Sequence, residues 1–381
     1  MDQGLSATAN LLGTVLVARW GSLDTLGVFG VAFAFYLAGL GLVRAAVGDP
    51  LVVAGGDMRH LPAIWAPAWL VLVPSMVVGS ALTAMHVGVA AVVSFALPAL
   101  FLQSSLRYLA FAQGRPDLAV LLDGTWVLSM TAGALLVVGA SSATSAAATW
   151  ALGGALAAVV GVLVFGCVPP GPSDALGSLT ELGRGLSRPL MAESVAFTAT
   201  STLLIPLALA AISLSYAGYF RAAAVICGPL TVALTAWELY SFPAISRAPE
   251  DQYRGVASRN SWFGFLLGCG LLLLILAVNQ PLQAVLLAGG VTVPVWIIAA
   301  VGVVPVVSAL AAGALGVLKR WRRGDRLLLA RLWSLGPGVL IVGAGLLTSS
   351  AVLVLVAPVV SAAAFAVLGW VRVINDASAL P

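Results

Sequence analysis

Charged residues are scarce in this 381-residue chain: aspartate, glutamate, lysine and arginine make up 8% of it, against 61% hydrophobic residues. A soluble domain carries about 25% charged residues. The mean hydropathy of +1.08 is typical of a protein that crosses a membrane many times. No stretch is long or polar enough for a separate soluble domain, so an all-α polytopic membrane protein is predicted.

Histidine and cysteine are also rare, which excludes several kinds of active site. His60 and His86 are the only histidines and are expected in loops on opposite sides, so a His-based metal site or catalytic triad is excluded. Cys167, Cys227 and Cys269 lack metal-binding spacing and are interpreted as small buried hydrophobes. There is no phosphate-binding loop motif. The chain is therefore not expected to be an enzyme or to carry a cofactor or metal.

Apolar segments of about 20 residues, enough for one bilayer crossing each, recur along the whole chain. They predict about 12 transmembrane helices at residues 3–20, 25–47, 63–84, 88–111, 118–140, 144–167, 190–212, 215–240, 260–279, 291–317, 327–347 and 350–371.

This count segregates the positive charges when both termini are placed in the cytosol. Sixteen of the 18 lysines and arginines then lie on the cytosolic side, Arg19 alone lies outside, and Arg221 lies within a helix. The sixteen are Arg44, Arg59, Arg107, Arg115, Arg184, Arg188, Arg247, Arg254, Arg259, Lys319, Arg320, Arg322, Arg323, Arg326, Arg331 and Arg372. The positive-inside rule explains this distribution, and the net charge of +4, better than nucleic-acid binding does.

The middle of the chain divides it into two halves. Residues 169–189 carry leucines at helical spacing beside charged residues, which predicts an amphipathic helix on the membrane surface. We expect an N-terminal six-helix lobe at 1–168, this linker at 169–189, and a C-terminal six-helix lobe at 190–381. A Gly-x-Phe pair opens the second and eighth predicted helices, at Gly27 and Gly218, 191 residues apart. Six crossings return the chain to the same side, so the lobes would be parallel repeats.

Arginines in or beside the helices are the first candidates for a binding site. Arg221 lies about two turns inside the eighth helix, where charge is expensive and usually functional. Arg44 and Arg19, at the inner end of the second helix and the outer end of the first, would face the same water-filled cavity. Guanidinium groups suit phosphate because their donors form a planar, permanently charged fork. The alternatives are snorkelling of Arg221 to the interface and pairing of Arg44 with Asp49.

Acidic and neutral polar residues complete the candidate set. Asp123 and Glu193 begin the fifth and seventh predicted helices, where a carboxylate can serve ion coupling or simply favour the helix dipole. Tyr36 and Asn10 are polar groups on the first two helices that either line the cavity or bridge helices.

Several patches resemble one family of transporters. Three parts of the chain are similar to stretches of Wzx-like polysaccharide flippases, which belong to the superfamily of the multidrug and toxin extruders (MATE) and lipid II flippases. They are the opening Asp2-Gln3-Gly4-Leu5-Ser6 with Asn10, Ala18-Arg19, Gly27-Val28-Phe29-Gly30 and Arg44; then Leu106-Arg107-Tyr108, Gly114-Arg115-Pro116 and Asp123 with Trp126; and Gly218-Tyr219-Phe220-Arg221 with Gly228-Pro229 and Pro243. The resemblance implies two six-helix lobes in a V around a central cavity, and a lipid-linked saccharide whose diphosphate is held by Arg19, Arg44 and Arg221.

The leading hypothesis is a bacterial plasma-membrane flippase that moves a lipid-linked oligosaccharide by alternating access. Its partners would be that substrate, membrane lipids, and a polysaccharide polymerase or glycosyltransferases, with no nucleic acid. One alternative is an ion-coupled MATE-type drug or metabolite exporter, which predicts more carboxylates than arginines in the cavity. A second alternative is a non-transporting membrane scaffold for envelope assembly.

Overall fold

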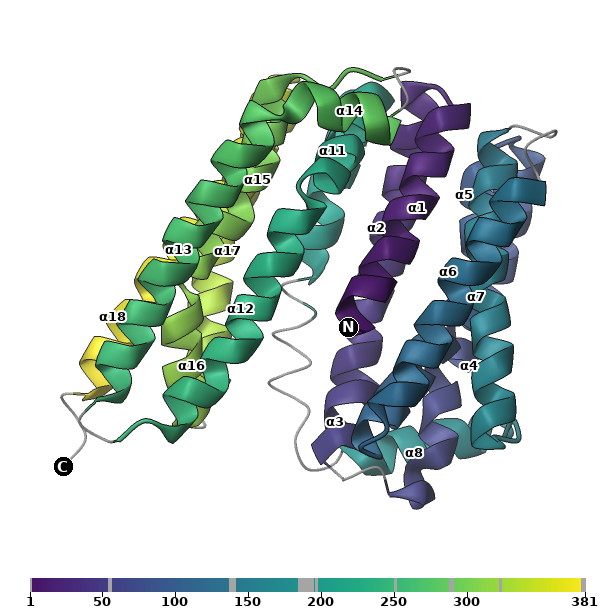
Figure 1. Ribbon diagram of the computed structural model, residues 1–381, viewed down its shortest axis with the longest axis horizontal. Helices are drawn as coiled ribbons and strands as arrows, with labels where there is room; N and C mark the ends of the chain where they lie inside the picture. The colour runs from purple at the N-terminus through teal and green to yellow at the C-terminus, as the bar shows by residue number, and fades with distance from the viewer. Residues whose placement is uncertain are drawn as a thin grey trace. The chain divides into compact units, whose positions relative to one another are not determined.

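Every regular element in the described part of the chain is a helix, which confirms the predicted all-α class (Figure 1). The computed structural model describes residues 2–53, 57–136, 142–183, 195, 198–249, 252–287, 291–321 and 324–377. The chain divides into two units, Met1–Thr198 and Ala199–Pro381. The expected V around a central cavity, and the boundaries given for the lobes, stay predictions.

The N-terminal unit is built from long helices joined by short turns. Its elements are α1 (Asp2–Trp20), α2 (Leu23–Val43), η1 (Arg44–Gly48), α3 (Asp49–Val53), η2 (Met58–Trp65), α4 (Ala66–Ala84), α5 (Gly88–Ala112), α6 (Pro116–Leu136), α7 (Ala143–Phe165) and α8 (Pro172–Gly183). Helix α5 lies at the centre of this unit, packed against α2, α4, α6 and α7. Within its apolar span 72% of the residues are buried, the largest share of any span in the described residues.

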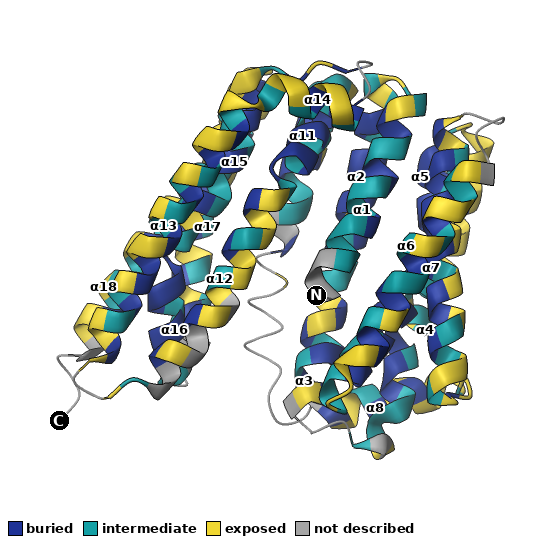
Figure 2. Cartoon of the chain, in the orientation of Figure 1, coloured by how far each residue is buried: buried dark blue, intermediate teal, exposed yellow. Residues whose placement is uncertain are grey.

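Glycine allows α2 and the following η1 to approach α5 closely. A Cβ atom at Gly39 would lie 1.9 Å from Cζ of Phe101, and one at Gly48 would lie 2.7 Å from Cγ of Tyr108. Small residues at such positions let membrane helices pack with their backbones near one another. The outward faces carry exposed apolar side chains beside buried ones, as expected for helices in contact with lipid (Figure 2).

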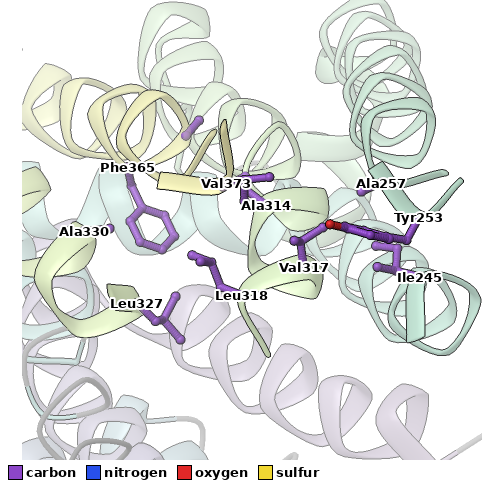
Figure 3. Packing of buried hydrophobic residues seen from close by; sticks show 12 residues of the cluster. Ile245, Tyr253, Ala257, Ala314, Val317, Leu318, Leu327, Ala330, Phe365 and Val373 are labelled. Carbon is purple, nitrogen blue, oxygen red and sulfur yellow. The ribbon is translucent and has the colours of Figure 1, made fainter. Parts of the chain in front are cut away.

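The C-terminal unit also contains long helices, beside one pair that is bent at a break. Its elements are η3 (Thr198–Leu204), α10 (Ile205–Ile212), α11 (Leu214–Ile226), α12 (Gly228–Arg247), α13 (Tyr253–Ala277), α14 (Asn279–Leu287), α15 (Val295–Ala309), α16 (Ala312–Arg320), α17 (Gly324–Leu347) and α18 (Ala351–Ala377). One of its cores joins the ends of α12, α13, α16, α17 and α18 through small and aliphatic side chains, with Tyr253 and Phe365 as its aromatic members (Figure 3).

Arg320, one of the arginines predicted to be cytosolic, makes its contacts within the C-terminal unit. Its Nη1 atom donates hydrogen bonds to the carbonyl oxygens of Ile245 and Ala248, at 2.9 and 2.8 Å. Its guanidinium carbon lies 4.8 Å from the ring centroid of Tyr253. A cation at a helix C-terminus satisfies terminal carbonyl groups and complements the helix dipole, so Arg320 holds the end of α12.

The predicted count of twelve crossings is not confirmed. Nine helices in the described residues are long and apolar enough to cross a membrane, and ten if the bent pair α11 and α12 forms one span. Helix α1 is not among the nine, and the predicted crossing 190–212 is represented by the shorter apolar helix Thr202–Ile212, since most residues before it lie outside the described part. The count of twelve therefore stays a prediction.

The predicted amphipathic helix in the linker exists as α8. It packs against η2 and α4 of the N-terminal unit. Ala175 is fully buried, and Leu182 and Leu179 belong to a core cluster with Val47 and Ile64. The segment η2 thus covers part of the apolar face of α8, while Leu176 stays 37% exposed, so the expected position on the membrane surface stays a prediction.

The two helices that carry the predicted repeat begin in the same way. Ser22 caps α2 by accepting a hydrogen bond from the Thr25 amide at 3.2 Å, and Ser213 caps α11 by accepting one from the Ser215 amide at 3.2 Å. Like Gly27 and Gly218, the two serines are 191 residues apart. The Gly-x-Phe pair seen in the sequence therefore lies in two helices that begin with the same kind of serine cap.

Candidate functional site

A buried ion pair lies inside the N-terminal unit, between α5 and α6. Arg107 Nε lies 3.3 Å from Asp123 Oδ2, and the Asp123 side chain is completely buried. Gln103 Nε2 donates a hydrogen bond to Asp123 Oδ1 at 3.0 Å, and Arg107 Nη1 donates one to Ser6 Oγ on α1 at 3.2 Å. Three helices thus contribute to one polar network in an apolar bundle.

The helices position this network in a regular way. Gln103 and Arg107 are four residues apart on α5 and therefore lie on one face of it. Arg107 is five residues before the end of α5 and Asp123 seven after the start of α6, at the end where the two helices are joined. At 1.5 Å per residue, the pair lies about 8–10 Å inside these helix ends. It is therefore part of the membrane-spanning region and not of a loop.

Aromatic side chains form a second cluster in the same unit. Tyr36 of α2 is buried, with its ring centroid 5.2 Å from that of Trp150 and 6.5 Å from that of Phe101. Trp126 Nε1 donates a hydrogen bond to the carbonyl oxygen of Trp150 at 2.9 Å. Such surroundings exclude water and lower the local dielectric constant, which strengthens interactions between neighbouring charges.

Asn10 and Tyr36, the two neutral residues predicted for the site, lie in different surroundings. Tyr36 lies within the aromatic cluster. The Asn10 side-chain oxygen is buried and has no hydrogen-bond partner among the described residues. Thr14, one turn further along α1, donates to the Asn10 carbonyl at 3.0 Å. A role for either residue in substrate binding stays a prediction.

Arg19 and Arg44 lie at opposite ends of α2. Arg19 is exposed in the last turn of α1, and Arg44 follows the last residue of α2. The 21 residues of α2 separate them by about 30 Å along the helix axis. They cannot hold the same phosphate. Arg44 also pairs with Asp49 at 3.3 Å, on the surface, so the structural pairing that competed with a binding role does occur.

Arg221 lies in the C-terminal unit on a broken span. It is half-buried, seven residues after the start of α11, and α11 meets α12 at a bend of 56°. The bend occurs at Cys227, Gly228 and Pro229, where proline cannot continue the hydrogen-bond ladder of a helix. The buried Cys227 thiol points to the carbonyl oxygen of Ile298 on α15, at 3.6 Å.

The remaining predictions concern carboxylates and metals. Glu193 lies outside the described residues, so its ion-coupling role stays a prediction. Asp123 is buried as required for such a role, but Arg107 already balances its charge. Within the described ranges no group of three or more histidines, cysteines, aspartates or glutamates is placed to hold a metal ion.

Sequence reasoning missed Arg107, Gln103 and Ser6 as members of a site. Arg107 was assigned only to the cytosolic excess of positive charge, since it falls near a predicted helix end. The available signal was the pair Gln103 and Arg107 at a spacing of four residues within an apolar helix. Its partner Asp123 is 16 residues further along the chain, and a sequence does not reveal such pairing.

The geometry can be compared with known proteins. No family model and no curated protein matches the sequence. Among solved structures, a multidrug resistance MATE family transporter of the MOP superfamily, in an inward-facing conformation, is similar with a TM-score of 0.70 and 13% identity, covering 98% of this chain and 95% of that one. The fold is that of a MOP-superfamily transporter.

Two further structures share the MOP fold. The lipid II flippase MurJ, in an inward closed conformation, has a TM-score of 0.64 and 10% identity, covering 98% of this chain and 85% of that one. A MOP superfamily transporter from Pyrococcus furiosus, described by the reverse polarity of its binding pocket, has a TM-score of 0.62 and 12% identity, covering 100% of this chain and 94% of that one. The three structures thus share their fold with this chain, whose described residues include nine helices long and apolar enough to cross a membrane.

Proposed function

We propose that the chain is a flippase that moves a lipid-linked oligosaccharide, or a related cell-envelope polysaccharide intermediate, across the bacterial plasma membrane by alternating access. Both termini would be cytosolic. The substrate would arrive from membrane-bound glycosyltransferases and leave towards a polymerase, and membrane lipids would surround the protein throughout.

The observation that carries this proposal is Arg221, a half-buried guanidinium group within a spanning helix pair that bends by 56°. An arginine at this depth is unfavourable in lipid and is retained where it meets a polar path or ligand. A bent span exposes backbone polar groups beside it, as in the discontinuous helices of other transporters. The likeness to a lipid II flippase supports a lipid-linked substrate.

Ion coupling is assigned to Asp123, with Glu193 as a second carboxylate. A proton or sodium ion at Asp123 would compete with Arg107 for the carboxylate, so the bound ion and the ion pair would be alternatives. The energy would come from an ion gradient or the membrane potential, in keeping with the missing phosphate-binding loop.

The test is to replace Arg221 with Ala and with Lys and to follow surface polysaccharide in cells that depend on this protein. We expect loss of export with Ala and partial loss with Lys, since Lys keeps the charge but not the fork. Arg115→Ala is the matched control, because Arg115 pairs with Asp117 on the surface at 3.1 Å. Normal export by both Arg221 variants at normal protein level would remove the proposed phosphate-binding role.

An ion-coupled drug or metabolite exporter is the second candidate, supported by the likeness to a multidrug resistance MATE transporter. It would take a cationic or neutral substrate, and the buried carboxylate Asp123 favours it. Drug sensitivity of a deletion strain separates the two, since only the exporter predicts sensitisation with unchanged surface polysaccharide. The scaffold alternative gains no support from a fold shared with transporters.

A further inference from the structure

The two members of the buried ion pair are unequally enclosed. The side chain of Asp123 has no solvent exposure, whereas that of Arg107 keeps 15% of its surface exposed. Gln103, itself buried, donates a hydrogen bond to the carboxylate, and Ser6 of α1 accepts one from the guanidinium group. A ligand that approaches the pair therefore meets the arginine first, and the carboxylate stays behind it.

Stability alone is a weak reason to keep such a pair. Removing two charges from water costs several kcal/mol per ion, and an apolar pair of similar volume is often as stable or more so. Within a membrane-spanning region, ionisable side chains usually mark a substrate or ion path. Arg107 and Asp123 lie in that region, about two turns from the helix ends, so a role for the pair in binding is the better explanation.

We propose that Arg107 is an anion-binding residue of the N-terminal unit and that Asp123 is its internal counter-ion, which only a ligand with at least two negative charges displaces. The proposal rests on the flippase function proposed above and names a residue outside the set Arg19, Arg44 and Arg221. A diphosphate offers several oxygens to the guanidinium fork. A monoanion offers the arginine no more charge than Asp123 already does.

The neighbours of Asp123 allow Arg107 to leave the carboxylate and bind a ligand instead. When Arg107 turns to a ligand, Gln103 still donates to Asp123 Oδ1, so the carboxylate keeps a hydrogen bond in its buried position. The long, flexible arginine stem moves its head group without moving α5. Asp123 thereby acts as a specificity-determining residue, because it raises the charge that a ligand needs in order to bind.

The test uses purified protein in nanodiscs of phosphatidylcholine, with farnesyl diphosphate and the monocarboxylate farnesoate as probes. Wild type should bind the diphosphate and not farnesoate. Arg107→Gln should weaken diphosphate binding at least about tenfold. Asp123→Asn should have the opposite effect and raise the affinity for farnesoate by about tenfold, with a smaller gain for the diphosphate. Arg115→Gln, a surface arginine near the same end of α5, should bind like wild type.

A double variant distinguishes loss of ligand binding from loss of folding. Arg107→Gln with Asp123→Asn replaces the ion pair by two amides that can bind each other, and it should elute as a folded protein while binding neither probe strongly. Equal diphosphate affinity in wild type, Arg107→Gln and the double variant would overturn the assignment of Arg107 but leave the flippase proposal intact. Absence of diphosphate binding by wild type would overturn both.

Discussion

The two units differ in what they bury. The largest completely buried side chains of the described residues, among them Trp126, Trp150, Tyr36, Phe29 and Phe33, all belong to the N-terminal unit. That unit also holds Asp123, the one charged side chain that is fully buried in the described part of the chain. The core of the C-terminal unit shown in Figure 3 is mainly aliphatic, and its arginines cap helix ends or lie over rings.

The N-terminal unit therefore combines a dense aromatic core with a buried ion pair, whereas the C-terminal unit combines a mainly aliphatic core with a bent span. Substitutions in the two units should therefore differ in their effects.

Removing the centre of the aromatic cluster should have the largest effect. Trp150 is fully buried with four aromatic rings within about 6 Å, so Trp150→Ala should lower the free energy of unfolding by about 3–5 kcal/mol. Trp262→Ala in the C-terminal unit is the control, because Trp262 is 57% exposed. Denaturant unfolding in detergent measures both, and similar values for the two variants would refute the proposed difference between the cores.

Breaking the ion pair should come next. Asp123→Leu leaves Arg107 partly buried without its carboxylate and should destabilise by about 3–5 kcal/mol. Arg107→Met together with Asp123→Leu should recover most of that loss, since no buried charge then remains. A double-mutant cycle in the same unfolding assay measures the coupling. Purely additive single effects would mean that the two residues do not interact.

Close helix packing in the C-terminal unit should be sensitive to a single methyl group. A Cβ atom at Gly313 would lie 2.2 Å from the carbonyl oxygen of Ala257, so Gly313→Ala must separate α16 from α13 and should cost about 1–3 kcal/mol. Gly255→Ala on α13 is the matched control: its Cβ meets nothing within 4 Å, and it should stabilise by about 0.5–1 kcal/mol. The two variants should therefore shift the thermal unfolding midpoint in opposite directions.

The smallest effect is expected outside both cores. The exposed Arg59 guanidinium group donates to Asp57 and lowers the pKa of that carboxyl to about 2. A lowered pKa stabilises the folded state at pH values above the ordinary pKa, and this contribution is lost as the pH falls towards 2. Arg59→Ala should return the Asp57 pKa towards its ordinary value, measurable by carboxyl NMR, with little change in unfolding at neutral pH. An unchanged pKa would mean that the pair does not form in solution.

The sequence predicted the features that depend on local composition. Helical class, most apolar spans, the helix of the linker and the Gly-x-Phe pair shared by α2 and α11 all follow from residues close together in the chain. Helix α8 shows the limit: its period predicted a helix, but not that η2 would pack against Leu179 and Leu182. That outcome depends on the surface of a segment more than 100 residues earlier in the sequence.

The candidate site shows the same limit more strongly. Arg221 was singled out because a charge within an apolar run is visible in the sequence. Arg107 was overlooked, since its meaning comes from Asp123 on another helix and from the depth at which α5 ends. Arg19 and Arg44 are close in sequence, yet α2 separates them by about 30 Å.

One amide side chain in the C-terminal unit has a mechanical consequence. Gln283 of α14 donates to the Val293 carbonyl at 3.1 Å and accepts from the Val293 amide at 2.7 Å, so it ties α14 to the segment that enters α15. Both helices pack against α11, which bears Arg221. A displacement of α15 would therefore be transmitted to α14 through this side chain, and α11 would be affected through both of its neighbours.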